Sequence, residues 1–187
     1  AGGGFDLTLN FSGTTTVNGA NFTGIRNLAT GNGGTTQLTG AITTSGTQTY
    51  NDAVTLTGAT TLASSGNGAI AFNGTVNGAQ TLAVNTTGAT TFAGAVGGTT
   101  ALTSLTTNAG GTTSIGGNVT TTGAQTYNDA VILTGGGTRT FASTGNNALA
   151  FNSTVDGGSD LIANTTGATT FAGAVGGTTP LTSVTTN

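Results

Sequence analysis

The sequence predicts an all-β fold, a parallel β-solenoid in which short coils stack into a rod. Three observations predict it. The stretch from 85 to 108 returns at 164 to 187 with only two substitutions. A five-residue motif recurs at shorter spacing inside this long repeat. The composition is rich in β-branched Thr and Val, contains 35 Gly, and lacks Glu, Lys and Met, so helices are disfavoured.

The first expected element is a strand near the amino terminus. Phe5, Leu7, Leu9 and Phe11 alternate with polar residues. Such alternation is typical of a strand with one buried face. From residue 14 the chain matches a later part of the repeat, so it enters the repeat partway through a copy.

The rest of the chain is organised by the long repeat. GTQTYNDAV at positions 46–54 returns as GAQTYNDAV at positions 123–131. From Leu62 onward, which matches Phe141, the offset between the copies is larger by two. The second copy has therefore gained two residues near Gly135–Gly137, which we expect in a loop. We predict one continuous solenoid over residues 1–187, made of a partial repeat 1–34, a repeat 35–111, and a second repeat 112–187 that ends partway.

The short motif begins with an apolar residue and ends, four positions later, with Val or Ile. Its copies are Leu38–Ile42, Tyr50–Val54, Phe72–Val76, Phe92–Val96, Ile115–Val119, Tyr127–Val131, Phe151–Val155 and Phe171–Val175. The copies are unevenly spaced, and four of them fall in each long repeat. If each unit is one coil, this predicts coils of about 19 to 20 residues and about nine to ten coils in all.

The two ends of the motif are expected to point inward and to form the core. A single coil cannot bury its apolar face, whereas stacked coils place equivalent residues in columns about 4.8 Å apart. The predicted core residues are Phe72, Val76, Phe92, Val96, Ile115, Val119, Phe151, Val155, Phe171 and Val175.

The middle position of the motif indicates a bend. It holds Gly40, Asp52, Gly74, Gly94, Gly117, Asp129, Ser153 and Gly173, the residue types that bends select. A carboxylate in an apolar core without a cationic partner costs too much free energy. We therefore expect Asp52 and Asp129 at corners, where Gly or Asn could replace them. The asparagines just before the bend are candidates for stacked ladders, namely Asn51, Asn73, Asn128 and Asn152.

Composition and charge exclude several function classes. A net charge of -3 with 4% charged residues gives no basic footprint for nucleic acid. The apolar runs are too short to span a bilayer, so we expect no membrane insertion. Without His, Cys, Lys or Glu, the usual catalytic bases and nucleophiles are missing.

The acidic residues predict neither catalysis nor metal binding. Asp52 and Asp129 are expected four coils apart, about 19 Å. A glycosidase pair needs about 5 to 9.5 Å. The segment 156–160, DGGSD, has only a passing similarity to calcium-binding solenoid repeats. We expect no enzyme activity, no cofactor and no metal.

Three alternatives remain open. Disorder is disfavoured because hydrophobic residues make up 34% of the chain and are regularly spaced. An antiparallel sandwich also uses short strands, but it has no reason to preserve a near-identical long repeat. An ice-binding solenoid would use outward Thr arrays, for which the paired Thr60–Thr61, Thr90–Thr91 and Thr112–Thr113 are candidates.

The segment from Gly110, GGTTSIGGNVTTTGAQTYNDAV, together with the two NTTGATTFAGAVGGTT segments, resembles the repeats of giant bacterial exoproteins similar to filamentous haemagglutinin. The resemblance covers nearly the whole chain from Gly13. It implies a right-handed parallel β-helix, secretion by a two-partner or autotransporter route, and a role in adhesion, aggregation or biofilm.

We therefore expect a structural repeat module of an extracellular adhesin or fibre, located outside the cell or on a bacterial cell surface. The expected partners are further copies or flanking solenoid of the same chain, end to end, and a host or matrix surface. Neither end carries a polar capping coil, so both are expected to expose strand edges. Asn-x-Ser/Thr triplets begin at Asn10, Asn21, Asn73, Asn85, Asn118, Asn152 and Asn164. Chance produces such triplets in this composition, so the sequence alone supports no glycosylation.

Overall fold

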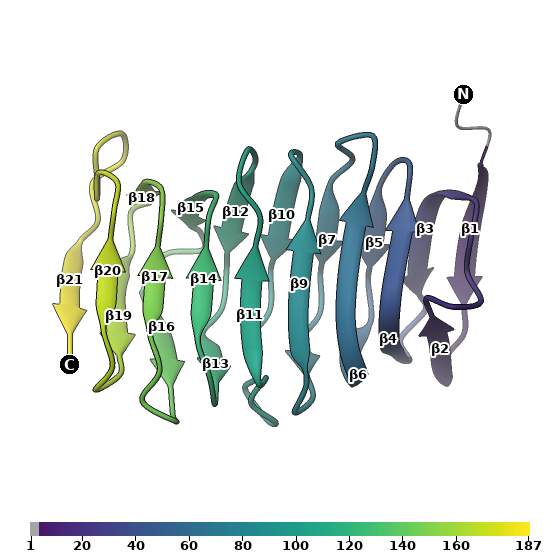
Figure 1. The fold of residues 1–187 in the computed structure, drawn as a ribbon, viewed down its shortest axis with the longest axis horizontal. Coiled ribbons are helices and arrows are strands. Elements are labelled where there is room, and N and C mark those ends of the chain that lie inside the picture. Colours follow the sequence, from purple (N-terminus) through teal and green to yellow (C-terminus); the bar gives the residue numbers. More distant parts are fainter. Residues whose placement is uncertain (1–3) are drawn as a thin grey trace.

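The computed structural model describes residues 4–187, which form an all-β solenoid of about nine turns. The chain starts at one end of the rod and finishes at the other (Figure 1). The strands are β1 (Phe5–Asn10), β2 (Thr14–Asn18), β3 (Ile25–Gly31), β4 (Thr35–Thr44), β5 (Gln48–Tyr50), β6 (Ala53–Ser64), β7 (Ile70–Phe72), β8 (Val76–Asn77), β9 (Thr81–Asn85), β10 (Ala89–Phe92), β11 (Ser104–Thr107), β12 (Thr112–Ile115), β13 (Val119–Thr121), β14 (Gln125–Tyr127), β15 (Ala130–Leu133), β16 (Thr138–Ser143), β17 (Leu149–Phe151), β18 (Val155–Asp156), β19 (Asp160–Asn164), β20 (Thr169–Phe171) and β21 (Ser183–Thr186).

A full coil has three sides, and each side pairs in parallel with the same side of the next coil; in the first coil the segment between β2 and β3 forms no strand on the third side. Face A consists of β1, β3, β5, β7, β10, β12, β15, β18 and the bridge at Val175. Face B consists of β2, the first halves of β4 and β6, β8, the bridge at Val96, β13, β16, β19 and β21. Face C consists of the second halves of β4 and β6, then β9, β11, β14, β17 and β20.

Two long strands bend from face B onto face C without a loop. In β4 the pairing register shifts between Leu38 and Gly40. Gly40 has a φ of 79°, a left-handed conformation that glycine adopts without steric cost. The glycine in the middle of this motif therefore makes the corner.

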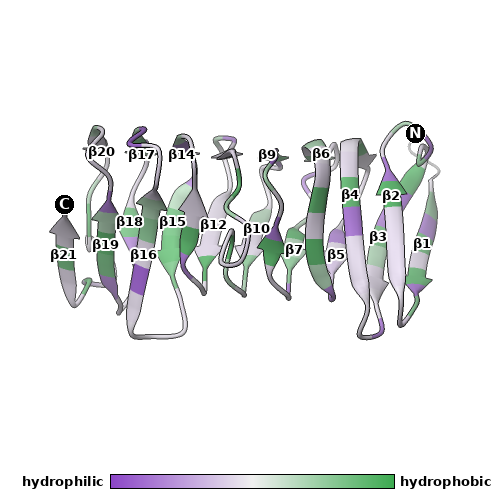
Figure 2. Ribbon diagram, turned by 90° about the horizontal axis from the view of Figure 1, so that it is seen from below, coloured by the Kyte–Doolittle hydropathy of each residue, from purple (hydrophilic) through white to green (hydrophobic). Residues whose placement is uncertain are grey.

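Apolar side chains from successive coils fill the interior in columns. Hydrophobic and hydrophilic residues alternate along many of the strands (Figure 2). On face A the Phe72 ring stacks on Tyr50 and Phe92, with ring centroids 5.1 and 4.9 Å apart. On face C the Phe151 ring stacks on Tyr127 and Phe171 at 5.2 and 5.1 Å. Stacked aromatic pairs contribute free energy beyond the area that they bury, about 0.5 to 1.5 kcal/mol each.

Most residues expected in the core lie there. Six of the ten, from Phe72 to Val119 in chain order, are at most 1% exposed, and Phe151 and Val155 are fully buried. The two others lie towards the carboxy-terminal end. Phe171 is only partly buried. Val175 is 38% exposed, because it belongs to the last coil and has a neighbouring coil on one side only.

The long repeat does not contain a whole number of coils, which corrects the expectation that each motif is one coil. Between the equivalent residues Tyr50 and Tyr127 the chain passes eleven sides: β5, both halves of β6, β7, β8, β9, β10, the segment at Val96, β11, β12 and β13. Eleven sides at three per coil make 3⅔ coils, or about 21 residues per coil, instead of four coils of about 19 to 20. The short spacings, from Leu38 to Tyr50 and from Ile115 to Tyr127, are two sides of a coil and not a coil.

Each copy is therefore rotated by two thirds of a turn relative to the copy before it. Tyr50 lies on face A, whereas its equivalent Tyr127 lies on face C. The insertion at Gly135–Gly137 lies in the loop between β15 and β16, as predicted.

Candidate functional site

The two corner aspartates are buried, contrary to the expectation that burial would cost too much. Asp52 is 5% exposed and Asp129 is 2% exposed. Asp52 Oδ1 accepts hydrogen bonds from the backbone N–H groups of Gly33 at 2.9 Å and Gly34 at 3.2 Å. Asp129 Oδ1 accepts one from Gly111 at 2.8 Å. Backbone donors of the preceding coil thus replace the missing cationic partner.

A pair of threonines completes each aspartate corner. In the first copy Thr36 donates to the Thr30 hydroxyl at 2.9 Å, and Asp52 Oδ2 is buried without a partner among the described residues. In the second copy Thr113 donates to Asp129 Oδ2 at 3.3 Å. There the Thr107 hydroxyl has no described partner instead. The hydroxyl of Thr36 or Thr113 has one hydrogen to donate, so it bonds either the other threonine or the aspartate, and the remaining group is left without a partner in the described part of the chain.

Burial and hydrogen bonding act on Asp129 in opposite directions. Burial raises the pKa of its carboxyl above the ordinary 3.8, and the bonds from Gly111 and Thr113 partly offset that increase. Because the two corners lie 3⅔ coils apart and on different faces, Asp52 and Asp129 cannot act on one substrate as a catalytic pair.

A buried glutamine forms a second polar corner, which sequence reasoning missed. Gln48 is fully buried and donates through Nε2 to the Ile42 carbonyl at 3.2 Å, the Thr44 hydroxyl at 3.3 Å and the Ala63 carbonyl at 2.9 Å. Its Oε1 accepts the Tyr50 hydroxyl at 2.8 Å. Both the Nε2 donors and the Oε1 acceptor of the Gln48 amide are therefore hydrogen-bonded. Burial raises the pKa of the Tyr50 hydroxyl.

The same network recurs around Gln125 at a different corner. Gln125 Nε2 donates to the Val119 carbonyl, the Thr121 hydroxyl and the Ala142 carbonyl at 3.4, 3.2 and 2.9 Å. Its Oε1 accepts the Tyr127 hydroxyl at 2.9 Å. The signal in the sequence was the identical Gln-Thr-Tyr in both copies. The glutamine that begins this triplet is polar because it forms the buried network, and not because it is exposed.

Asparagines at the motif corners form ladders, as the sequence predicted. Asn73 Nδ2 donates to Asn51 Oδ1 at 2.7 Å, and Asn51 Nδ2 donates to the Thr30 carbonyl at 3.0 Å. In the second copy Asn152 Nδ2 donates to Asn128 Oδ1 at 2.8 Å. These side chains join successive coils at their outer corners.

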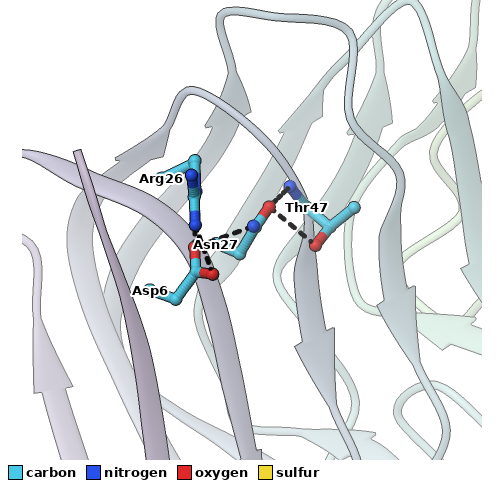
Figure 3. A network of polar contacts seen from close by, with 4 residues as sticks. All are labelled: Asp6, Arg26, Asn27 and Thr47. Carbon is cyan, nitrogen blue, oxygen red and sulfur yellow. Dashed lines mark hydrogen bonds and ion pairs between the residues drawn. The ribbon is translucent and has the colours of Figure 1, made fainter. Parts of the chain in front are cut away.

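The first three coils carry a polar network on the outside of face A (Figure 3). Arg26 forms a bidentate ion pair with Asp6 at 2.7 and 2.8 Å, and Asn27 Nδ2 donates to the same carboxylate at 2.8 Å. Asn27 Oδ1 accepts the Thr47 backbone N–H at 2.8 Å. The hydrogen bond from Arg26 is the largest cause that lowers the pKa of Asp6 to about 2. The network ties three coils together at the surface.

The central outward columns of faces A and C do not carry one chemistry in register. On face C the stacked outward residues are Ala41, Thr61, Ala83, Thr106, Thr126, Ala150 and Thr170. On face A they are Ala29, Thr49, Ala71, Thr91, Ser114, Ile132 and Asp156. Neither column keeps Thr over more than two successive coils, so no observation favours the ice-binding alternative.

The acidic segment 156–160 is used by the protein itself. Asp156 Oδ1 accepts the backbone N–H groups of Thr178 and Thr179 at 2.8 and 3.1 Å. Asp160 accepts the Ser183 hydroxyl at 2.7 Å and the Thr138 hydroxyl at 3.3 Å. Within residues 4–187 there is no group of three or more His, Cys, Asp or Glu side chains that could hold a metal ion.

One shallow groove of about 420 Å³ lies beside the loop before β3. Its lining includes Phe22, Ile25 and Thr44 and contains no charged side chain. It therefore presents no group for acid–base or metal chemistry. Across the described residues, no helix is long and apolar enough to cross a membrane.

Comparisons with known proteins returned no relative. No family model matches the chain, and neither the curated proteins nor the solved structures contain a match.

Proposed function

We propose that the chain is a structural repeat module of an extracellular bacterial adhesin or surface fibre, in which it forms part of a stalk. The observation that carries the proposal is the recurrence of one complete hydrogen-bond set, around Gln48 and again around Gln125, at two different corners of one uninterrupted rod. The Gln and Tyr side chains of both hydrogen-bond sets are fully buried, whereas the outward residues along faces A and C differ from coil to coil.

With this arrangement, repeating the sequence sets the length of the rod and leaves the construction of its core unchanged. Each added copy extends the rod by 3⅔ coils, about 18 Å at a rise of about 4.8 Å per coil. Because every coil contacts only its neighbours, stability grows with the number of coils and needs no new core. A stalk needs this combination of reach and simple extension.

The partners and the location belong to the same proposal. The first and last described coils expose Phe5, Phe11 and Val184, which are 57%, 56% and 46% exposed, beside strand edges that pair on one side only. Further solenoid of the same chain would cover these edges. A host or matrix surface is the proposed target of the complete fibre.

Surface labelling tests the proposal. Antibodies raised against the purified chain are applied to intact cells of the organism that makes it, and to the same cells after permeabilisation. A stalk outside the cell is labelled equally in both. Labelling only after permeabilisation would contradict an extracellular location.

A further inference from the structure

The Asn-x-Ser/Thr triplets differ from the other asparagines in their exposure. All seven triplet asparagines are exposed, whereas five of the remaining eleven, Asn18, Asn27, Asn77, Asn108 and Asn128, are partly buried. Exposure is the first requirement of an acceptor for N-linked sugar. It does not by itself select among the seven.

The hydrogen bonds of the asparagine side chains reduce the number of candidate acceptors. The Nδ2 atoms of Asn73 and Asn152 donate within the corner ladders. Asn118 Oδ1 accepts the backbone N–H of residue 140 at 3.0 Å. Among the described residues the side chains of Asn85 and Asn164 form no hydrogen bond, and these two are equivalent positions of the long repeat.

The threonine after each of these asparagines holds the two triplets in the same orientation. Thr86 is 2% exposed, donates to the Gly68 carbonyl at 2.7 Å and accepts the Gly88 N–H at 3.0 Å. In the second copy Thr165 makes the equivalent bonds to Asn147 at 2.8 Å and from Gly167 at 3.0 Å. The middle residue is anchored inward, so the asparagine and the third residue of each triplet face outward.

The two triplets of the first coil lack this anchor. The side chains of Asn10 and Asn21 also form no hydrogen bond among the described residues, but each is followed by a phenylalanine. Phe11 is 56% exposed, and Phe22 lines the shallow groove. Neither ring can fix the triplet by the hydroxyl bonds that the anchored threonines make, so these two sites are left out of the proposal.

We propose that Asn85 and Asn164 are acceptor sites for N-linked glycosylation. In this reaction Asn Nδ2 attacks the anomeric carbon of a sugar that is activated as a glycosyl diphosphate. The new N–C bond forms as the C–O bond to the diphosphate breaks, the diphosphate leaves with the electron pair, and the amide nitrogen releases one proton. The proposal rests on the proposed extracellular function.

The rotation of the copies determines where the sugars would lie. Asn85 ends β9 on face C, whereas Asn164 ends β19 on face B. Equivalent sites therefore point away from different sides of the rod. Three successive copies, eleven coils, would place one sugar at each of the three faces, which would hydrate the rod evenly and oppose side-by-side association.

The test uses the folded chain, a sequon-specific N-glycosyltransferase that is active on a synthetic Asn-Thr-Thr peptide, and uridine diphosphate glucose as the donor. Peptide mass spectrometry locates the sugar. We expect one hexose at Asn85 and one at Asn164, with little at Asn73 and Asn152. Thr87→Ala should remove the first hexose alone and Thr166→Ala the second alone, because each loses the triplet hydroxyl on an exposed side chain.

The matched control is Thr103→Ala, another exposed threonine outside any triplet, which should keep both hexoses. No sugar at Asn85 and Asn164 would overturn the proposal, as would equal modification of Asn73 and Asn152. Neither result would bear on the stalk function, which the surface labelling of intact cells tests separately.

Discussion

At the scale of single residues, the rod is held by buried polar side chains that bind the backbone of a neighbouring coil. Asp129 lies at such a corner, with its carboxylate on the Gly111 N–H. The bond explains why a charge is tolerated in an otherwise apolar interior. Leaving a buried backbone donor without a partner costs about 1 to 3 kcal/mol.

This predicts different outcomes for two substitutions of Asp129. Asp129→Asn keeps an oxygen for Gly111 and should stay close to the wild-type free energy of unfolding. Asp129→Gly removes the acceptor and should lower it by about 1 to 3 kcal/mol. Urea unfolding of the three proteins measures this. Equal stability of the Gly and Asn variants would show that the position is only a bend, as the sequence suggested.

The ion pair at the first coils predicts a dependence on pH. The folded pKa of Asp6 is about 2, below the ordinary 3.8 that applies to the unfolded chain. A lowered folded pKa means that Asp6 stabilises the fold above about pH 4, and that this contribution is lost as the pH falls towards 2. Asp6→Asn should lack the contribution throughout.

The measurement is the difference in unfolding free energy between wild type and Asp6→Asn from pH 2 to 6. It should be largest above pH 4 and shrink towards pH 2. Asp129, whose raised pKa favours folding at low pH, is present in both proteins and cancels. A difference that stays constant with pH would refute the role given to Asp6.

At the scale of elements, the columns of stacked aromatic rings are the main apolar packing in the core that the sequence motif encodes. Phe92 is 1% exposed and packs on Phe72. Its neighbour Thr91 points outward on the same strand. Alternation along β10 thus separates a core position from a surface position by one residue.

Phe92→Ala should lower the free energy of unfolding by about 3 to 5 kcal/mol, because a large buried ring is lost and a cavity remains. Thr91→Ala should change it far less, and Phe171→Ala, which removes a partly buried ring near the end of the rod, should lie between them. Thermal unfolding compares the three. If Thr91→Ala proved as damaging as Phe92→Ala, the inward face would be misassigned.

The motif in the sequence predicted these columns and corners, but not how the copies wind. Phe72 and Phe92 were expected inside because stacking requires apolar columns, and they lie there. The spacing from Leu38 to Tyr50, however, does not reveal whether it spans one coil or two sides of a coil. Gln48 was missed because a lone buried amide has no signature until its partners are in place.

At the scale of the whole molecule, both ends of the described rod leave apolar side chains uncovered. Phe5 and Phe11 lie in the first coil, and Val175 and Val184 in the last. Open strand edges with apolar neighbours readily pair with another chain. End-to-end contact between molecules would continue all three faces.

The chain of residues 1–187, made alone, should therefore associate into longer rods as its concentration rises. Sedimentation velocity over about a hundredfold concentration range follows this by mass action. Replacing Phe5 and Phe11 by Ser should reduce the association, while Ile132→Ser, a change of an exposed residue on the side of the rod, should not. A clean monomer at every concentration would contradict the prediction.

The claim that each copy turns by two thirds of a turn decides how every repeated feature is displayed along the rod. It makes Thr126 stack on Thr106 of face C, at the spacing of adjacent strands. If the motifs stacked one on the next, Thr126 would instead lie on Ser114, its equivalent in the preceding motif. The structure places Ser114 on face A, paired with Thr91 and Ile132.

Disulfide trapping distinguishes the two arrangements in a chain that has no cysteine of its own. The variant with Thr106→Cys and Thr126→Cys should form an intramolecular disulfide under mild oxidation, since adjacent parallel strands bring their Cα atoms to about 4.8 Å, within disulfide reach. The variant with Ser114→Cys and Thr126→Cys should stay reduced. The opposite result, a disulfide in the second variant and none in the first, would contradict the rotation of the copies.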